Sequence, residues 1–331
     1  MSGVFFIVGP TATGKSEIAA EVACKTGAEI VSADAFQIYR GLDLLSAKPD
    51  LSTVAKAPHH LIGTVPLAEE MNAEKFRCAA TCAIKAINSR GKFPIVVGGS
   101  GLYIKALTHG LAPVPSAEPK LREKLNAMSL DDLRPELAKL DPEAARKIDL
   151  KNRRRVVRAV EICLLSGKPA SALVPEGDDL GESADVRPGS APAATEPESP
   201  ISATATEPGS SLPATGVFLF RDREKLYERI NQRVESMFKC GVIEEVRAAG
   251  VTSATASQMI GFREIRELLA GKKSLPQCIA DIQQSTRRYA KRQLTWFRRQ
   301  TNFSPLNLSF LTHKEAVERI SLRMLSEAGT R

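Results

Sequence analysis

The octapeptide GPTATGKS, residues 9–16, follows a short apolar run and precedes a helical pattern. Its spacing, Gly9-x-x-x-x-Gly14-Lys15-Ser16, is that of a P-loop, in which glycines permit a tight turn and backbone N–H groups surround an anion. Lys15 supplies a point charge, and Ser16 stands where its hydroxyl can ligate Mg²⁺ or hold a phosphate oxygen. The loop therefore predicts a bound phosphate group, which is either a nucleoside triphosphate or another polyphosphate.

Short apolar runs alternate with helical patterns in the first part of the chain. The runs are Val4–Val8, Glu29–Ser32 and Pro94–Val97, and each ends in a polar or glycine-rich turn. This alternation predicts an α/β fold, a P-loop NTPase-like core with a parallel sheet flanked by helices, plus a small all-helical insertion domain. Because ligands of such sheets bind at the carboxyl ends of the strands, we expect the three turns to converge on one site.

The chain is expected to divide into four parts. Residues 1–113 form the P-loop α/β core, and residues 114–170, which read as short charged helices, form the helical insertion domain. Residues 171–216 contain no aromatic residue and no lysine, so they predict a disordered low-complexity linker. Residues 217–331 resume with a strand-like run and complete the core with helices.

Composition indicates a globular protein with reduced thiols. The net charge of +8 weakly favours an anionic partner. The six cysteines are scattered without the spacing of a disulfide framework or a zinc site, which is typical of a cytoplasmic protein. No segment approaches the roughly 20 apolar residues of a membrane-spanning helix, so no membrane contact is expected.

Two polar side chains follow the second and third apolar runs. Asp34 lies across the expected crevice from Lys15, where a carboxylate serves as a general base, a Mg²⁺ ligand or a helix N-cap. Ser100 stands on a glycine-rich turn, where its hydroxyl either donates to a phosphate or leaving-group oxygen or caps a helix. The chain lacks the Asp-Asp or Asp-Glu strand end of strong ATPases, which argues against a motor but not against a small kinase.

Two helical stretches carry basic faces. In residues 286–299 six cations share one arc, with aromatic residues opposite. In residues 152–158, Arg154, Arg155 and Arg158 share a face. Gln293 falls among the aromatic residues of the first stretch, where a buried amide needs partners and could read the edge of a base. Such basic faces can be ordinary solvated surfaces. Two of them in one P-loop protein favour the other interpretation, in which core and insertion together bind a nucleic acid.

Eight stretches of the chain resemble motifs of the tRNA dimethylallyltransferases, also called tRNA isopentenyltransferases. They are GPTATGKS (9–16), SADAFQIYRGLDLLSAKP (32–49), APHHL (57–61), VGGSGLYIKALTHG (97–110), RVVRAVEICLLSGK (155–168), LYERINQRVESMFKCG (226–241), QMIGFRE (258–264) and KRQLTWFR (291–298). They follow the family's order over nearly the whole chain outside the predicted linker. The chain departs from the family at Ala35, where Ser is common, and at Leu45-Ser46, where Gly-Thr is common.

The resemblance implies a prenyltransferase that modifies tRNA. It would move a dimethylallyl group from dimethylallyl diphosphate to N6 of the adenosine just 3′ of the anticodon and release diphosphate, with Mg²⁺ as cofactor. The P-loop would then hold the diphosphate of a prenyl donor rather than ATP. The insertion domain would contact the anticodon stem-loop of the tRNA, and the basic helix of the C-terminal part would also bind tRNA. We expect a cytoplasmic monomer.

The resemblance also assigns roles to single residues. Asp34 matches the general base that accepts the N6 proton. Ser100 stands where the family more often has Thr and would hydrogen-bond the bridging oxygen of the leaving diphosphate, while Ser16 would meet Mg²⁺. The implied donor contacts are Gly9, Pro10, Thr11, Ala12, Thr13, Gly14, Lys15, Ser16 and Arg233. The implied tRNA contacts are Asp34, Ala35, Phe36, Gln37, Ser100, Arg122, Arg154, Arg155, Val156, Val157, Arg158, Gln258, Met259, Ile260, Gly261, Phe262, Arg263, Lys291, Arg292, Gln293, Leu294, Thr295, Trp296, Phe297 and Arg298.

Three other functions share parts of this pattern. A P-loop small-molecule kinase would need the loop and Asp34 but not the basic helix of residues 286–299. An adenylate isopentenyltransferase would use the same donor on a free nucleotide and has no reason for a basic insertion. A non-catalytic RNA-binding protein would need the basic helices but not Asp34 and Ser100 at strand ends. The released product, the size of the acceptor and the presence of turnover distinguish these three from a tRNA prenyltransferase.

Overall fold

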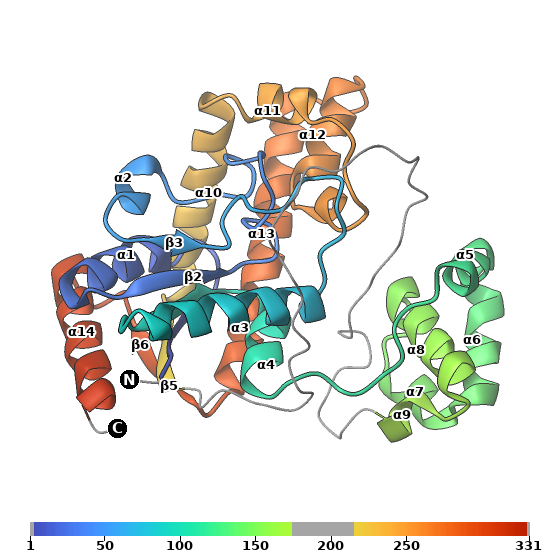
Figure 1. Cartoon of the computed structure of the whole chain (residues 1–331). Helices are drawn as coiled ribbons and strands as arrows, with labels where there is room; N and C mark the ends of the chain where they lie inside the picture. Colours follow the sequence, from blue (N-terminus) through green and yellow to red (C-terminus); the bar gives the residue numbers. More distant parts are fainter. Residues whose placement is uncertain (1–2, 174–214, 330–331) are drawn as a thin grey trace, which may run out of the picture. The chain divides into compact units, whose positions relative to one another are not determined.

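The computed structural model describes residues 3–173 and 215–329 (Figure 1). The chain divides into two compact units. The core unit contains, of the described residues, 3–71, 76–109 and 215–329, and the helical unit contains 72–75 and 110–173. The predicted insertion of residues 114–170 falls within the helical unit.

A six-stranded, all-parallel sheet forms the centre of the core unit, in the order β3-β2-β4-β1-β5-β6. Its strands are β1 (Phe5–Val8), β2 (Glu29–Ala33), β3 (His59–His60), β4 (Pro94–Gly98), β5 (Thr215–Phe220) and β6 (Phe303–Asn307). Every residue of β1, β2 and β4 is buried, as the continuous apolar runs predict for a parallel sheet covered on both faces. The predicted P-loop-like α/β fold is therefore confirmed.

Helices cover both faces of this sheet. The described helices of the core unit are α1 (Lys15–Thr26), α2 (Leu51–Val54), α3 (Ala73–Ser89), α4 (Gly101–Thr108), α10 (Arg223–Lys239), α11 (Val242–Ala248), α12 (Phe262–Leu269), α13 (Leu275–Arg298) and α14 (His313–Gly329), with a 3₁₀ turn at Ala256–Gln258. On one face, Ile18 of α1 and Ile320 of α14 pack in the same cluster as Phe5. On the other face, the ring of Phe218 stacks on Phe297 of α13 with centroids 5.6 Å apart. The P-loop and α13 therefore belong to the same packed body.

The predicted linker of residues 171–216 is too long at both ends. The described part of the helical unit ends in α9 (Ala170–Leu173), and β5 begins at Thr215. Thr215 and Gly216 pair with Phe5 and Phe6 of β1, and composition does not encode such backbone pairing. The remainder of the predicted linker lies outside the described residues.

Within residues 110–173, the helical unit has helices α5 to α8 besides α9, drawn in green in Figure 1. They are α5 (Pro119–Ala127), α6 (Leu130–Leu140), α7 (Pro142–Lys147) and α8 (Arg153–Ser166). Its apolar core includes Leu133 and Leu137 of α6 and Val156 and Val160 of α8. The side chain of Asn152 caps α8 by accepting the N–H of Arg155.

A charged cluster is enclosed in this helical core. Arg122 Nε donates to Glu161 Oε1 at 3.0 Å, and Arg158 Nη1 donates to Glu161 Oε2 at 2.6 Å. Arg158 Nη2 also donates to the carbonyl of Pro115 at 2.8 Å. Glu161 is fully buried, and both arginines are nearly so. Burial lowers the pKa of Arg158, and the Glu161 carboxylate opposes that shift.

Removing the Glu161 carboxylate should make the helical unit less stable. We expect Glu161→Gln to lower the free energy of unfolding by about 3–5 kcal/mol, because two buried guanidinium groups lose their counter-charge. Urea unfolding followed by circular dichroism measures the change. The control is Glu143→Gln, which removes an exposed pair with Lys147 and should change little. Equal shifts for the two variants would contradict a stabilising role of the buried cluster.

Candidate active site

The P-loop needs glycine at two positions. Gly9 has φ 153°, and an added Cβ there would lie 2.1 Å from the carbonyl oxygen of Leu219. Gly14 has φ 93° and caps α1, so the backbone turns from β1 into α1 through the left-handed region. The loop therefore stands at the carboxyl end of β1 and at the N-terminus of α1, a position that favours anions.

Four cationic side chains surround this loop. Lys15 Nζ donates to the carbonyl of Pro10 at 3.0 Å. Arg233 Nη1 donates to Thr11 Oγ1 at 2.9 Å, and Arg229 Nε donates to the carbonyl of Ala12 at 2.9 Å. Arg221 Nε donates to the carbonyl of Thr13 at 3.0 Å. The three arginines bond atoms of the loop and add positive charge beside it.

Arg221 and Arg229 are missing from the sequence prediction, although Arg233 is in it. One signal was available, because Arg229 and Arg233 are four residues apart and so share a face of α10. Arg221 follows β5 directly, at the strand end where ligands of parallel sheets bind. That β5 lies next to β1 is a property of the sheet order, which no local pattern discloses.

Burial lowers the pKa of two cations beside the loop, Lys15 and Arg233. It lowers the pKa of Lys15 to about 8, while the Asp34 carboxylate raises it and Arg233 adds to the lowering. Burial also lowers the pKa of Arg233, again opposed by Asp34. The Asp34 carboxylate therefore acts electrostatically on both cations, which agrees with its expected place across the crevice.

Asp34 occupies the turn after β2. Its Oδ1 accepts the backbone N–H of Phe36 at 2.9 Å and that of Gln37 at 3.3 Å. Among the described residues no hydrogen bond to its Oδ2 is found. One carboxylate oxygen thus shapes the turn, as in a cap, and the other is available for a substrate proton.

Ser100 stands at the start of α4 but does not cap it with its side chain. Its Oγ accepts the N–H of Ala35 at 3.0 Å, which ties the turn after β4 to the Asp34 turn. Tyr289 of α13 lies beside both residues: burial and the Asp34 carboxylate raise its pKa, and a hydrogen bond with Ser100 opposes the rise. The structure therefore brings together Asp34, Ser100 and Tyr289.

Two pockets meet at Asp34. The polar pocket has lining residues that include Lys15, Ser16, Ser32, Asp34, Gln37 and His59. The apolar pocket has lining residues that include Thr11, Asp34, Phe36, Leu45, Arg233, Val234, Met237, Met259, Ile260, Ile282 and Tyr289. A ligand with a charged end and a hydrocarbon end would find complementary surroundings for each end.

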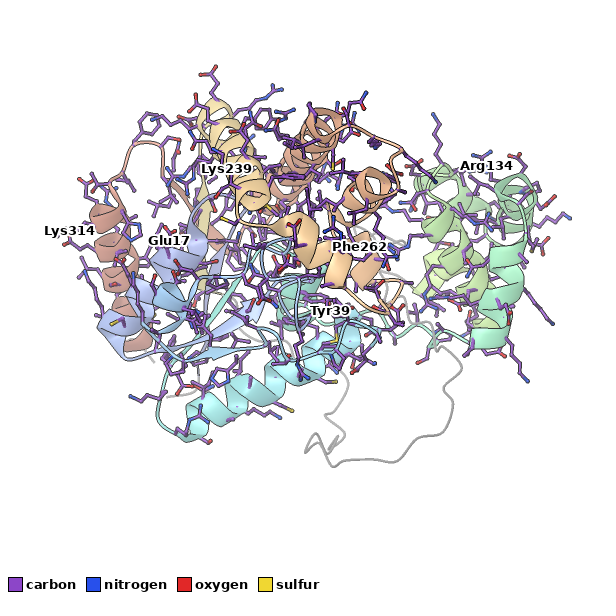
Figure 2. All side chains as sticks on the ribbon, turned by 90° about the horizontal axis from the view of Figure 1, so that it is seen from above. Glu17, Tyr39, Arg134, Lys239, Phe262 and Lys314 are labelled. Atoms are coloured by element: carbon purple, nitrogen blue, oxygen red, sulfur yellow. The ribbon has the colours of Figure 1, made fainter. Side chains whose placement is uncertain are left out.

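The predicted tRNA contacts of the core unit differ in exposure. Gln258, Arg263, Lys291, Arg292, Thr295 and Arg298 are exposed, and Ala35, Phe36, Gln37, Ile260, Leu294 and Trp296 are half-buried. Met259, Gly261, Phe262, Gln293 and Phe297 are buried, and Phe262 is labelled in Figure 2. The expectation that Gln293 reads a base does not fit its contacts, because both ends of its amide bond to the backbone of this chain.

The predicted contacts of the helical unit also differ in exposure. Arg154 is exposed and Arg155 is half-buried, but Val156, Val157 and Arg158 are buried on α8. Arg122 of α5 is buried as well, in the cluster around Glu161. The prediction of a basic surface through Arg158 is therefore wrong, because its guanidinium neutralises a buried carboxylate that helix periodicity alone does not indicate.

The donor atoms at the site suit a magnesium ion held mainly by substrate. Ser16 and Asp34 line the polar pocket and offer hard oxygen atoms. Within residues 3–173 and 215–329, no three His, Cys, Asp or Glu side chains gather as a metal site. Mg²⁺ fits such surroundings because it keeps several waters and is commonly bound through one or two protein oxygens plus phosphates.

Membrane insertion by a helix finds no support in the described part of the chain. No helix there is both long enough and apolar enough to cross a bilayer.

Comparison with known proteins places these features in one family. The family model described as IPP transferase matches residues 37–300. A tRNA dimethylallyltransferase of Geobacter sulfurreducens is 40% identical over 303 residues, 88% of each chain. The tRNA dimethylallyltransferase 1 of Citrifermentans bemidjiense is 38% identical over 298 residues, 89% of this chain and 88% of that one.

Solved structures of tRNA prenyltransferases also resemble this chain. The full-length tRNA isopentenylpyrophosphate transferase of Bacillus halodurans superposes with a TM-score of 0.67 at 30% identity, covering 98% of this chain and 96% of that one. A eukaryotic dimethylallyltransferase, captured in crystals acting on tRNA, has a TM-score of 0.74 at 25% identity, covering 98% of this chain and 80% of that one. The similarity therefore extends over nearly the whole length of this chain.

Proposed function

The chain belongs to the IPP transferase family of tRNA dimethylallyltransferases, and from that premise we propose which of its residues carry the reaction. The protein is a prenyltransferase that modifies tRNA. In the proposal, the donor is dimethylallyl diphosphate and the acceptor is N6 of the adenosine just 3′ of the anticodon. The observation that carries the assignment of the base is the place of Asp34, which lines both the polar and the apolar pocket.

The proposed step is a substitution at the allylic carbon. N6 of the adenosine attacks C1 of the dimethylallyl group, and the bond from C1 to the diphosphate oxygen breaks. Asp34 Oδ2 accepts the proton that N6 loses, so the step ends with a neutral alkylated amine and a free diphosphate. The Oδ1 contacts with two backbone N–H groups support this assignment, because they hold the carboxylate at the turn.

The leaving diphosphate is proposed to lie in the P-loop. The backbone N–H groups of residues 9–16, the ammonium of Lys15 and the guanidinium of Arg233 would stabilise its charge. The Ser100 Oγ accepts a hydrogen bond from Ala35, and on donor binding its O–H would turn from Tyr289 to the bridging oxygen. The apolar side chains Leu45, Met237 and Met259 supply hydrocarbon surroundings of the kind a dimethylallyl group prefers.

Magnesium is part of the proposal. Ser16 would hold the ion together with the diphosphate, and the ion would supply charge stabilisation of the leaving group. The diphosphate substrates of this family, together with the oxygen donors at the polar pocket, support it.

We propose that exposed cationic side chains bind the acceptor tRNA. Lys291, Arg292 and Arg298 on α13, and Arg154 on α8, are exposed and would contact phosphates of an anticodon stem-loop. A single-stranded loop base is the least costly to move out of its stack, so the target adenosine could reach Asp34. We propose that residues 114–170 contribute to this RNA grip, and that the enzyme works as a cytoplasmic monomer.

One assay tests the function and separates it from the alternatives. Unmodified tRNA is incubated with the protein, Mg²⁺ and dimethylallyl diphosphate, and its nucleosides are analysed by mass spectrometry. We expect dimethylallyl-adenosine and released diphosphate, both abolished by EDTA and restored by added Mg²⁺. Modification of free AMP but not of tRNA would establish an adenylate isopentenyltransferase instead, and ADP formation from ATP would establish a kinase.

The reaction should respond to pH through Lys15. Because the pKa of Lys15 is lowered to about 8, its ammonium is present below that pH and is lost as the pH rises through it. The KM for dimethylallyl diphosphate is therefore expected to stay low below about pH 8 and to rise above it. Steady-state kinetics across this range measure the effect, with the KM for tRNA as an internal control. A donor KM that is constant through pH 9 would contradict the prediction.

A further inference from the structure

Gln293 connects two loops at the carboxyl ends of neighbouring strands. It lies on the buried side of α13 with only 6% of its surface exposed. Its Oε1 accepts the N–H of Thr11 in the P-loop at 2.9 Å, and its Nε2 donates to the carbonyl of Gly99 at 2.8 Å. Since a backbone N–H only donates and a carbonyl only accepts, these two partners determine the orientation of the amide.

The amide lies close against the glycine turn after β4. A Cβ added at Gly99 would lie 2.4 Å from Gln293 Nε2 and 2.8 Å from the carbonyl oxygen of Gly9. The two loops also meet directly, because the N–H of Gly9 donates to the carbonyl of Gly98 at 3.2 Å. Gln293 adds a second connection further along each loop. It joins Thr11 in the P-loop to Gly99, the residue before Ser100.

The contacts separate Gln293 from its neighbours in sequence. Lys291, Arg292 and Thr295 of the same stretch are exposed, whereas Gln293 faces the P-loop. Gln293 therefore contacts the loops proposed to bind the prenyl donor, although the sequence around it predicts tRNA binding. Both ends of its amide are engaged on the donor side of the site, Oε1 by Thr11 and Nε2 by Gly99.

We propose that Gln293 is a positioning residue for prenyl transfer, which holds the P-loop and the Ser100 turn in one register so that both contact the same diphosphate. The inference rests on the proposed function, because that function assigns the diphosphate to the P-loop and its bridging oxygen to Ser100. Gln293 touches neither the donor nor the acceptor in this arrangement. It acts through the N–H of Thr11 and the carbonyl of Gly99.

Two substitutions distinguish a positioning role of the Gln293 amide from a role in which its side chain only fills space. Gln293→Met keeps the length of the side chain but leaves the N–H of Thr11 and the carbonyl of Gly99 without their partner. Gln293→Glu can replace the amide only when protonated, because an ionised carboxylate would direct an oxygen at the carbonyl of Gly99. Burial raises the pKa of such a carboxyl group, so its proton is lost at a higher pH than usual.

The experiment measures transfer kinetics, tRNA affinity and thermal unfolding for these variants. Gln284→Glu is the matched control, since Gln284 is exposed on the same helix. We expect Gln293→Met to lower kcat/KM for the donor by about 100-fold, the scale of a small misplacement of reacting groups, with unchanged tRNA affinity. The melting temperature should fall by about a few degrees, because two buried backbone groups lose their partner while the chain stays folded at the assay temperature.

The pH profile gives the second readout. The ratio of Gln293→Glu activity to wild-type activity should fall as the pH rises from about 6 to about 8.5. Lys15, Asp34, His59, Arg221, Arg229, Arg233 and Tyr289, the titratable side chains at the P-loop and in the two pockets, are present in every variant, so the fall would come from the introduced carboxyl. Gln284→Glu should match the wild type at every pH.

Three outcomes would overturn the inference. They are wild-type kinetics for Gln293→Met, a fold-loss of tRNA affinity equal to the fold-loss of activity or a variant already unfolded at the assay temperature, and an activity ratio for Gln293→Glu that does not change with pH. The proposed function fails separately, if the wild-type protein forms no dimethylallyl-adenosine in the same assay.

Discussion

Asp34→Asn is expected to lower kcat for dimethylallyl transfer by about 10²–10⁴-fold, the contribution typical of a general base. The substitution isolates the charge, because an Asn oxygen can still accept the N–H groups of Phe36 and Gln37 that shape the turn. Thermal unfolding and tRNA binding should therefore stay close to wild type. Single-turnover formation of dimethylallyl-adenosine, followed by mass spectrometry, measures the chemical step.

Two further variants make this test specific. Asp50→Asn changes another aspartate whose Oδ1 accepts a backbone N–H, that of Thr53, but which lines neither pocket. Its activity should be unchanged. Asp34→Ala should lose stability as well as activity, because both hydrogen bonds of the turn disappear. Full activity of Asp34→Asn would show that another group or solvent accepts the N6 proton.

Lys15→Met is expected to lower kcat/KM for dimethylallyl diphosphate by about 10²–10³-fold, the effect of removing one preorganised donor from a developing negative charge. The methionine keeps an unbranched apolar stem of similar length, so the loss reports the ammonium. The hydrogen bond from Nζ to the carbonyl of Pro10 also disappears, and this bond lies within the loop.

The control for this variant lies on the same helix. Lys25 is exposed in the last turn of α1, and Lys25→Met should leave the kinetics unchanged. The KM for tRNA should also be unaffected by Lys15→Met. A variant with normal donor kinetics would remove Lys15 from the diphosphate site, and the assignment of the P-loop to the prenyl donor would then lose its main support.

The sequence predicted much of the core unit because its signals are local. Gly9, Gly14, Lys15 and Ser16 define a loop by spacing alone, and continuous apolar runs of four or five residues define strands buried on both faces. Asp34 and Ser100 could be proposed because residues directly after parallel strands lie at one edge of the sheet. These inferences need only neighbouring residues and the general geometry of α/β folds.

Other features depended on residues far apart in the chain. The burial of Arg158 requires Glu161 and Arg122 to meet inside one helical core, and an arginine-rich helix gives no sign of that charge pairing. Arg221 and Arg229 contact the P-loop because β5 adds to the sheet beside β1. The start of β5 at Thr215 depended on backbone pairing rather than on side-chain character.

Sequence by itself determined the phosphate loop, the parallel sheet and the two polar residues at strand ends, because spacing and periodicity encode local backbone geometry. Only the tertiary structure decided how Gln293 is used: its amide bonds Thr11, 282 positions earlier, and Gly99, 194 positions earlier. Such partners are chosen by the packing of α13 against the sheet, and the free energy of burying a polar group requires that each be satisfied wherever the fold places it.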